Sequence, residues 1–223
     1  MGLILGIETA TKNCSVALFN NGRLVSLREK NTNKYLHGEQ LTVFIKDLLQ
    51  LEKVCVSELE AIALSKGPGS YTGLRIGTST AKGLCYSLEI PLISITTLRS
   101  MAYGMAKKSN YKIFCPMIDA RRMEVFSALY DKHNNQIREV NADIVNHDTY
   151  SSFLQEEILF FGDGALKCKK AINHKNAKFF KGIYPSAQDL GELAYRKFIN
   201  NNFEDIAYFE PYYLKDFVTG EKS

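Results

Sequence analysis

The segment over residues 67–77, Gly-Pro-Gly-Ser-Tyr-Thr-Gly-Leu-Arg-Ile-Gly, constrains the fold of this chain more than any other. It places four glycines and one proline in eleven residues, between an apolar run and an amphipathic run. Glycine adopts backbone angles that other residues avoid, and proline fixes its own φ angle. The segment therefore predicts a tight, specifically shaped turn that opens a helix. Such a turn either cradles a phosphate group or lets two segments pack closely.

Three strands are predicted before this turn, and helices alternate with strands around and after it. Apolar alternation indicates the strands, Asn20-Asn21-Gly22 is a hairpin signal, and apolar residues at helical spacing indicate the helices. The expected strands are 2–8, 13–19, 23–29, 61–65 and 92–95, and the expected helices are 36–51, 73–88 and 96–107. Three hairpin-connected strands followed by helix crossovers are typical of a ribonuclease-H-like α/β fold with a mixed sheet.

A similar order of elements returns after Lys107-Lys108-Ser109-Asn110, which is the best candidate linker. The expected strands are 112–118, 123–130, 137–142 and 158–161, and the expected helices are 148–155 and 186–199. The repetition predicts a duplicated fold with a partner-binding first lobe over 1–108 and a second lobe with a reduced set of elements over 109–223. Two positions stay open for the segment 203–223, which either returns to the first lobe or packs on the second.

Composition is that of an ordinary soluble protein, with 45% hydrophobic and 23% charged residues in a chain of 223. The apolar start meets Glu8 at once and lacks a basic flank, so no secretory signal is predicted. No apolar run reaches the roughly 20 residues that span a bilayer. Five scattered cysteines without a CxxC pair predict reduced thiols and a cytoplasmic location. The four histidines do not pair, so we expect neither a metal site nor a cofactor.

The glycine turn fits the known phosphate motifs poorly. No lysine follows it as the Walker pattern requires, and Ser70-Tyr71-Thr72 breaks the GxGxxG spacing. Thr72 as the helix N-cap and Arg75 would still suit an anion. We favour a packing role for the turn residues, which are Gly67, Pro68, Gly69, Gly73 and Gly77.

The helix that follows the turn carries two usable faces. One apolar stripe suits the core of its own lobe. A second stripe of mostly small residues consists of Ile76, Thr80, Gly83 and Ser87. Glycine costs up to about 1 kcal/mol of helix propensity relative to alanine, which favours a packing reason for Gly83. The stripe therefore predicts either a contact with another protein or a second internal face.

Acidic residues at the ends of predicted strands suggest a nucleotide site of the ribonuclease-H-like type. Such sites favour Asp followed by glycines, whereas this chain has Glu8 and then Ala10, whose Cβ would crowd a phosphate. We therefore predict no catalytic residue, and a vestigial nucleotide site at Glu8, Thr9, Asp119 and Asp163. The alternative is a small Mg-ATP-dependent ATPase or kinase that uses these carboxylates.

A basic stretch over 167–181 ends in Phe179 and Phe180. It would suit RNA phosphates and a stacked base, but a solvated lysine face is the favoured interpretation because the net charge is only +4.

Motifs along nearly the whole chain resemble the TsaB (YeaZ) family. They are Ile7-Glu8-Thr9-Ala10-Thr11, the glycine turn, Asp119-Ala120-Arg121, Gly162-Asp163-Gly164-Ala165 and Pro211-Tyr212-Tyr213-Leu214-Lys215. The resemblance implies an actin-like, sugar-kinase-like fold and a non-catalytic partner of TsaD. TsaD transfers threonylcarbamoyl to the adenosine beside the tRNA anticodon, and the ATPase TsaE joins the two. The resemblance does not imply a peptidase, although the family once carried a glycoprotease label.

The resemblance also implies where partners bind. In the family, the helices that match 36–51 and 73–88 form a bundle with TsaD, or with a second copy when TsaD is absent. The expected partner-binding residues are Leu41, Phe44, Ile76, Thr80, Gly83 and Ser87. Any contact with tRNA would be at most indirect, and no membrane contact is expected. Glu8 departs from the family, which usually carries Asp at this position.

Overall fold

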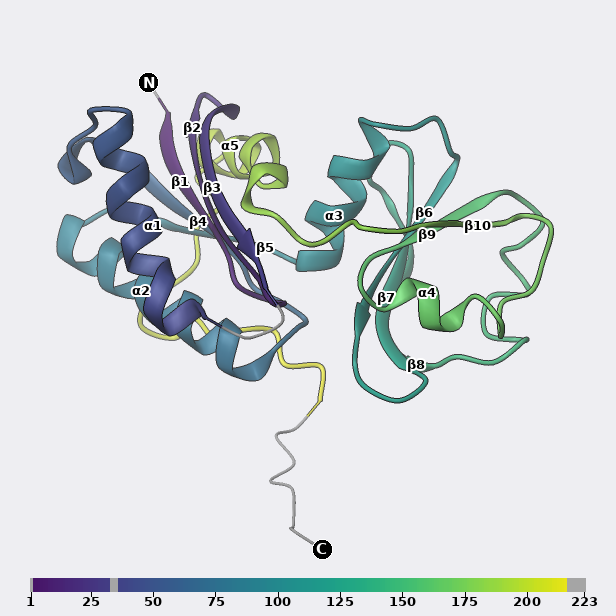
Figure 1. The fold of residues 1–223 in the computed structure, drawn as a ribbon. Coiled ribbons are helices and arrows are strands. Elements are labelled where there is room, and N and C mark those ends of the chain that lie inside the picture. Colours follow the sequence, from purple (N-terminus) through teal and green to yellow (C-terminus); the bar gives the residue numbers. More distant parts are fainter. Residues whose placement is uncertain (1, 33–35, 216–223) are drawn as a thin grey trace, which may run out of the picture.

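The computed structural model describes residues 2–32 and 36–215, which form two lobes, each built on a five-stranded mixed sheet (Figure 1). The first sheet has the order β3-β2-β1-β4-β5, and the second has the order β10-β9-β6-β7-β8. The strands of the first sheet are β1 (Leu3–Glu8), β2 (Asn13–Asn20), β3 (Arg23–Asn31), β4 (Ala61–Ser65) and β5 (Leu92–Ile95). Those of the second are β6 (Ile113–Asp119), β7 (Glu124–Asp131), β8 (Gln136–Ile144), β9 (Ile158–Phe161) and β10 (Ala177–Phe180).

Both sheets follow the same plan. In each, the first three strands form an antiparallel meander, and two later strands add to the other side in parallel. This repetition confirms the duplicated, ribonuclease-H-like fold that the order of elements predicts, and it agrees with the actin-like fold that the resemblance implies.

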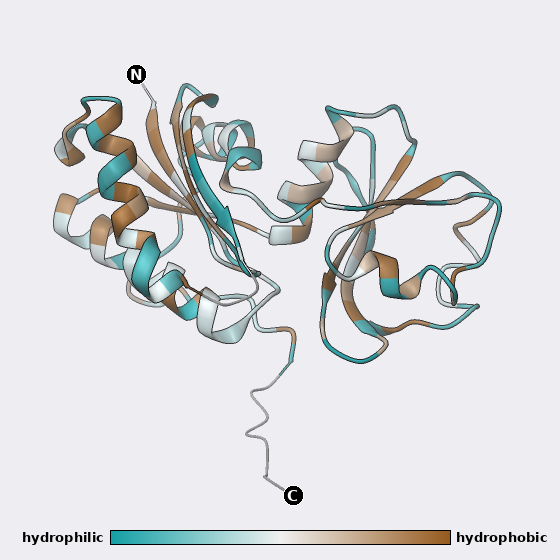
Figure 2. Cartoon of the chain, in the orientation of Figure 1, coloured by the Kyte–Doolittle hydropathy of each residue, from teal (hydrophilic) through white to brown (hydrophobic). Residues whose placement is uncertain are grey.

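Helices cover both faces of each sheet. The helices are α1 (His37–Leu51), α2 (Tyr71–Leu88), α3 (Thr97–Ala106), α4 (Ala165–Cys168) and α5 (Gly191–Ile199), with short 3-10 turns at Val56–Glu58 and Ala187–Asp189. In the first lobe α1 and α2 pack on the face that presents Leu5 and Ile7, and α5 packs on the opposite face with Ile4. Strands β1, β2, β4 and β5 are thus buried on both sides, whereas the edge strand β3 has exposed ends and a half-buried middle, and its last part is hydrophilic (Figure 2).

The helices do not pack on the sheets as the predicted division at residue 108 implies. Helix α3 precedes it but packs on the second sheet, where Leu98 and Met101 join Phe114 in one core. Helix α5 follows it but packs on the first sheet. A boundary at residue 108 therefore separates the two sheets and cuts across the helices that cover them. Sequence order could not reveal this exchange, because an apolar helix face fits either sheet.

The carboxy-terminal segment returns to the first lobe, one of the two positions left open. Phe209 is buried in its core, and the Glu204 N–H donates to the Leu92 carbonyl at 2.9 Å. The Tyr212 N–H donates to the Lys66 carbonyl at 2.7 Å. Residues 216–223 of the predicted second lobe lie outside the described residues.

Three local predictions are wrong. The helix expected over 148–155 is a series of turns, because the side chains of Asn146 and Thr149 bond to nearby backbone and to each other. The helix expected from residue 186 begins only at Gly191, after a 3-10 turn. Helix α2 begins at Tyr71, because Ser70, not Thr72, is the N-cap and accepts from the Gly73 N–H at 3.3 Å. Within the described ranges, no helix is long and apolar enough to cross a membrane.

Candidate functional site

The glycine turn packs directly against the two residues that follow β1. A Cβ atom on Gly69 would overlap the Ala10 carbonyl, and one on Gly73 would overlap the Thr9 carbonyl. On the next turn of α2, a Cβ on Gly77 would overlap Thr9 Oγ1. The Ser70 N–H also donates to the Ala10 carbonyl at 2.6 Å. These contacts explain why Gly69, Gly73 and Gly77 are glycines: the backbone of α2 and its turn packs too closely on Thr9 and Ala10 to leave room for a Cβ atom.

Gly67 has a different reason to be glycine. Its φ angle of +107° is one that side chains with a Cβ rarely adopt. An added Cβ would also crowd Leu74 and the Tyr212 carbonyl, each at 2.9 Å. Gly67 and Pro68 thus shape a bend that the returning carboxy-terminal segment covers.

The carboxylate of Glu8 is sealed inside the first lobe. Glu8 and Thr9 are each 0% exposed, and Glu8 Oε1 accepts the Ala10 N–H at 2.6 Å. Burial raises the pKa of Glu8 to about 7, although the hydrogen bond from the Ala10 backbone partly offsets that effect. A carboxylate that binds Mg-ATP must reach the ion, and this one is enclosed by its own chain.

Asp119 and Asp163 lie together at one end of the second sheet. The Asp119 N–H donates to Asp163 Oδ1 at 3.0 Å, and Lys167 Nζ forms an ion pair with the Asp119 carboxylate. Lys167 Nζ also donates to the Glu124 carbonyl at 2.6 Å. Asp119 and Asp163 therefore form one cluster with Lys167, while Glu8 and Thr9 form another.

These two clusters belong to different lobes, one at the end of β1 and the other at the end of β6. No hydrogen bond or ion pair between described residues joins Glu8 or Thr9 to Asp119 or Asp163. Among all the residues that the structure describes, no group of three or more His, Cys, Asp or Glu side chains is arranged to hold a metal ion. The vestigial nucleotide site at these four residues stays a prediction.

Helices α1 and α2 form an exposed surface with an apolar groove between them. The groove has a volume of about 490 Å³, and its apolar lining comes from Ile45, Leu49, Val54, Val56 and Leu84. Val43 and Leu51 on α1 are 49% and 55% exposed, so apolar surface continues past the groove. Sequence reasoning missed the lining residues as site residues, because their helical spacing indicates only a core-facing stripe.

The expected partner-binding residues do not all reach this surface. Leu41 is 1% exposed and packs in the core of the first lobe, so its assignment to the surface is wrong. Phe44 and Ile76 are half-buried at the edge of that core. Thr80 lines the groove, and Gly83 and Ser87 are exposed on α2. The small-residue stripe of α2 is therefore largely open to solvent.

Gly83 differs from the other glycines of α2. A Cβ built on Gly83 would meet no heavy atom within 4 Å, whereas one on Gly77 would overlap Thr9. Contacts within the described chain thus explain Gly77 but give no reason for Gly83. A glycine in a helix interior costs stability, so Gly83 keeps the exposed face of α2 flat at a cost to the free chain.

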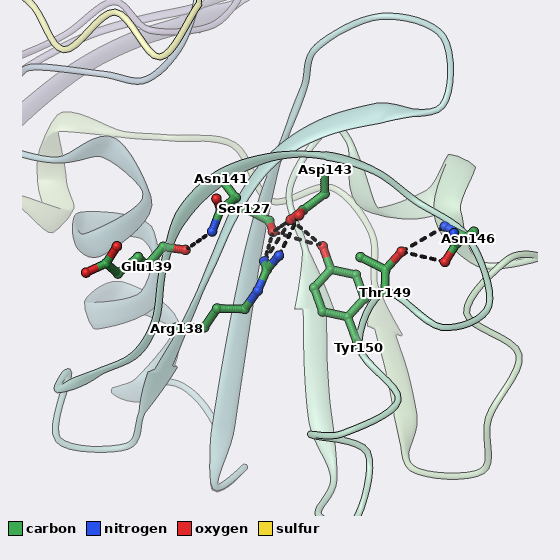
Figure 3. Close-up of polar contacts among 8 residues, drawn as sticks. All are labelled: Ser127, Arg138, Glu139, Asn141, Asp143, Asn146, Thr149 and Tyr150. Atoms are coloured by element: carbon green, nitrogen blue, oxygen red, sulfur yellow. Dashed lines mark hydrogen bonds and ion pairs between the residues drawn. The ribbon is translucent and has the colours of Figure 1, made fainter.

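A buried polar network in the second lobe was not predicted (Figure 3). Arg138 binds both carboxylate oxygens of Asp143, at 2.8 and 2.5 Å. Ser127 and the Tyr150 hydroxyl also donate to Asp143, at 2.5 and 3.1 Å. Burial alone would raise the pKa of Asp143, but the hydrogen bonds from Arg138 and Ser127 hold that pKa below its ordinary value. No short motif joins these residues, so the sequence gives no signal for the network.

The carboxy-terminal segment connects the two lobes. The Tyr213 ring lies 4.7 Å from the Tyr71 ring at the start of α2. Two residues later, Lys215 Nζ binds the Glu124 carboxylate of the second sheet, at 2.7 and 2.8 Å. We call residues 211–215 the strap, since they run from the glycine turn to the other lobe.

Solved structures with the same fold include two from Pseudomonas aeruginosa. One is described as an uncharacterized protein with similarity to peptidase YEAZ. It has a TM-score of 0.86 and 24% identity, over 96% of this chain and 100% of that one. The other, described as YeaZ, has a TM-score of 0.81 and 24% identity over the same shares. At this identity the likeness shows the fold.

Sequence comparisons show the family. The family described as TsaD, tRNA N6-adenosine threonylcarbamoyltransferase, matches residues 31–218. The tRNA threonylcarbamoyladenosine biosynthesis protein TsaB of Escherichia coli is 30% identical, over 98% of this chain and 97% of that protein. The TsaB protein of Buchnera aphidicola from Acyrthosiphon pisum is 38% identical over 60% of each chain. This chain therefore belongs to the TsaB (YeaZ) family of tRNA threonylcarbamoyladenosine biosynthesis proteins, within the broader family described as TsaD.

Proposed function

We propose that this chain is a non-catalytic scaffold subunit, which binds TsaD through the surface formed by α1 and α2. Together with TsaE, it holds TsaD in a state that adds threonylcarbamoyl to the adenosine beside the tRNA anticodon. Family membership supports a role in tRNA threonylcarbamoyladenosine biosynthesis. The burial of the Glu8 carboxylate supports the proposal that this subunit does not itself catalyse a reaction. Without TsaD, we expect two copies of the chain to pair through the same surface.

The exposed position of Gly83 carries this proposal. A close helix–helix contact needs small residues, because only they let the backbone of a partner approach. Gly83 lies between Thr80 and Ser87 on the open face of α2, and nothing in the described chain fills the space above it. A partner helix seated there would give the glycine a function that the isolated chain lacks.

The apolar groove beside this stripe supports the same surface. Ile45 and Leu84 line it from the two helices, and the half-buried Phe44 and Ile76 lie at the edge of the core. The core of a protein interface is apolar and packs as tightly as a protein interior, and the apolar groove provides such a surface beside the small-residue stripe. We therefore infer that the partner contributes helices, which complete a bundle over α1 and α2.

The experiment compares three variants of the full chain for binding to purified TsaD. Gly83→Leu adds a side chain on the proposed contact face, and Gly83→Ala adds a single methyl group. Ser152→Leu places the same leucine on an exposed turn of the second lobe and is the matched control. We expect Gly83→Leu to weaken the Kd for TsaD at least about tenfold, Gly83→Ala to weaken it less, and Ser152→Leu to leave it unchanged.

Calorimetry gives the Kd, and circular dichroism verifies that each variant folds. If Gly83→Leu folds normally and binds TsaD as tightly as the parent, the surface is wrongly assigned. Threonylcarbamoyl transfer by TsaD, measured with saturating parent chain and with saturating variant, then tests whether the scaffold role depends on this contact.

A further inference from the structure

The positive charge of the chain is concentrated in one short segment. Residues 167–181 contain six lysines and no aspartate or glutamate. Removing these six from the 28 basic side chains of the chain leaves 22, against 24 acidic ones. The remainder of the chain is thus slightly acidic, and its net charge of +4 comes from this segment alone.

The segment lies at an open edge of the second lobe. It includes the last two residues of α4, the loop after it and β10, which is the edge strand of the second sheet. In Figure 1 this edge lies at the far side of the molecule from α1 and α2. A molecule bound here would leave the proposed TsaD surface free.

Four of the lysines have no acidic partner in the described part of the chain. Lys167 pairs with Asp119, and Lys178 lies 3.4 Å from Glu157. The side chains left over are exposed and form no ion pair with another described residue; they are Lys169, Lys170, Lys175 and Lys181. Four like charges within 13 residues repel one another, which favours an anionic partner.

An exposed aromatic ring accompanies these lysines. Side chains alternate along a strand, and Phe179 points into the core, where its ring stacks on Phe160 at 5.1 Å. Phe180 therefore projects to the other side of β10 and is 53% exposed. Lys181 follows this ring directly in the sequence, and an exposed ring together with unpaired cations is the combination that binds single-stranded nucleic acid, since a base stacks on the ring and lysines contact phosphates.

We propose that this basic edge, defined as Lys169, Lys170, Lys175, Phe180 and Lys181, contacts the tRNA that the complex modifies. The lysines bind backbone phosphates, and Phe180 stacks on an unpaired base. The inference rests on the proposed function, because that function brings tRNA to the complex. It goes beyond that function by giving this subunit a direct contact with RNA, where the sequence favours a solvated lysine face.

The salt dependence of tRNA binding tests the proposal. An unmodified, fluorescently labelled tRNA transcript is titrated with the full chain, alone and with TsaD, between 50 and 200 mM salt, roughly the range over which such contacts are lost. Changing the four lysines to glutamine removes the proposed contacts. The control changes Arg23, Lys30, Lys108 and Lys132 to glutamine, which removes the same charge from exposed positions elsewhere.

We expect the patch variant to bind at least about tenfold more weakly at 50 mM salt. The slope of log K against log salt should become shallower by about 3, because each lost phosphate contact contributes roughly 0.7 to 0.9. The control should retain most of the parent's affinity and slope. Phe180→Ala should weaken binding about fivefold or more with little change in slope, whereas Tyr208→Ala, an exposed aromatic on the first lobe, should have no effect.

Two results would overturn the proposal: equal affinity and slope for the patch variant and the parent, or equal losses for the patch and control variants. Circular dichroism ensures that the variants compared are folded. Binding of the patch variant to TsaD is measured separately. If that binding persists while tRNA binding is unchanged, the basic edge is wrong and the scaffold function stands. If the parent chain itself fails to bind TsaD, the scaffold function fails, and the titration of the chain alone still decides the RNA contact.

Discussion

Gly77 of α2 lies so close to Thr9 that a Cβ atom on the glycine would overlap the threonine hydroxyl oxygen. Thr9 is fully buried and cannot move aside without disturbing the end of β1. The contact ties the glycine turn to the strand end where a ribonuclease-H-like enzyme would hold phosphate. In this chain the same position serves to pack α2 against the sheet.

The two glycines of α2 should respond in opposite ways to alanine. Gly77→Ala should lower the free energy of unfolding by about 1–3 kcal/mol, because the new methyl group overpacks a buried contact. Gly83→Ala should raise it by up to about 1 kcal/mol, because the methyl group meets open space and alanine favours the helix. Urea unfolding of the free chain measures both changes. Adding Thr9→Ala to Gly77→Ala should recover part of the loss, and strictly additive changes would contradict the direct contact.

The pH dependence of stability should carry a contribution from Glu8. Its folded-state pKa of about 7 lies above the ordinary value of 4.5, so the folded chain holds this proton more tightly than the unfolded chain. The contribution of Glu8 to stability is therefore highest below pH 4.5 and is lost as the pH rises to 7. The difference of 2.5 pKa units corresponds to at most about 3 kcal/mol.

Glu8→Gln isolates this contribution, because other groups titrate in the same range. Burial raises the pKa of Asp189 to about 6, which acts in the same direction, and burial lowers the pKa of His37, which acts in the opposite direction. Both remain in the variant, so the difference in unfolding free energy between parent and variant reports Glu8 together with its electrostatic interaction with Asp189. We expect that difference to favour the variant increasingly from pH 5 to pH 8. A constant difference across this range would show that Glu8 does not titrate there.

Much of the fold follows from local patterns in the sequence. The bounds of β4, β5 and β9 are those predicted, because short apolar runs between turn signals suit buried strands. The short elements α4 and β10 lie in the lysine-rich stretch, where polar residues hide their pattern. The exchange of α3 and α5 between the sheets depends on tertiary packing, which local periodicity does not record.

The candidate site also has a part that the sequence predicts and a part that only the folded chain reveals. The glycines of the turn signal an unusual backbone, and the structure places their contacts on Thr9 and Ala10. The family resemblance places Leu41 at the partner surface, although its helical spacing equally suits the core, where the structure has it. The Arg138–Asp143 network joins residues on different elements, so only the folded chain brings Ser127 and Tyr150 to it.

Removing one member of the Arg138–Asp143 network should destabilise the second lobe more than removing both charged members together. Arg138→Met leaves the Asp143 carboxylate buried without its cation and should cost about 3–5 kcal/mol. Arg138→Lys keeps the charge but loses the two-pronged contact, so it should cost less. The double variant Arg138→Met with Asp143→Leu should be more stable than Arg138→Met alone. Thermal and urea unfolding test this order, and a double variant that is less stable than the single one would contradict it.

The strap should protect the glycine turn from solvent. The Tyr212 N–H binds the Lys66 carbonyl, and the Tyr213 ring contacts Tyr71, so Tyr213→Ala should speed amide hydrogen exchange over residues 66–75. Lys215→Met removes only an ion pair whose lysine is 49% exposed, and its cost should stay below about 1 kcal/mol. The rate of amide hydrogen exchange in the glycine turn should therefore rise in Tyr213→Ala and change little in Lys215→Met. Equal effects of the two variants would mean that the strap acts through the second lobe, by way of Glu124, and not by covering the turn.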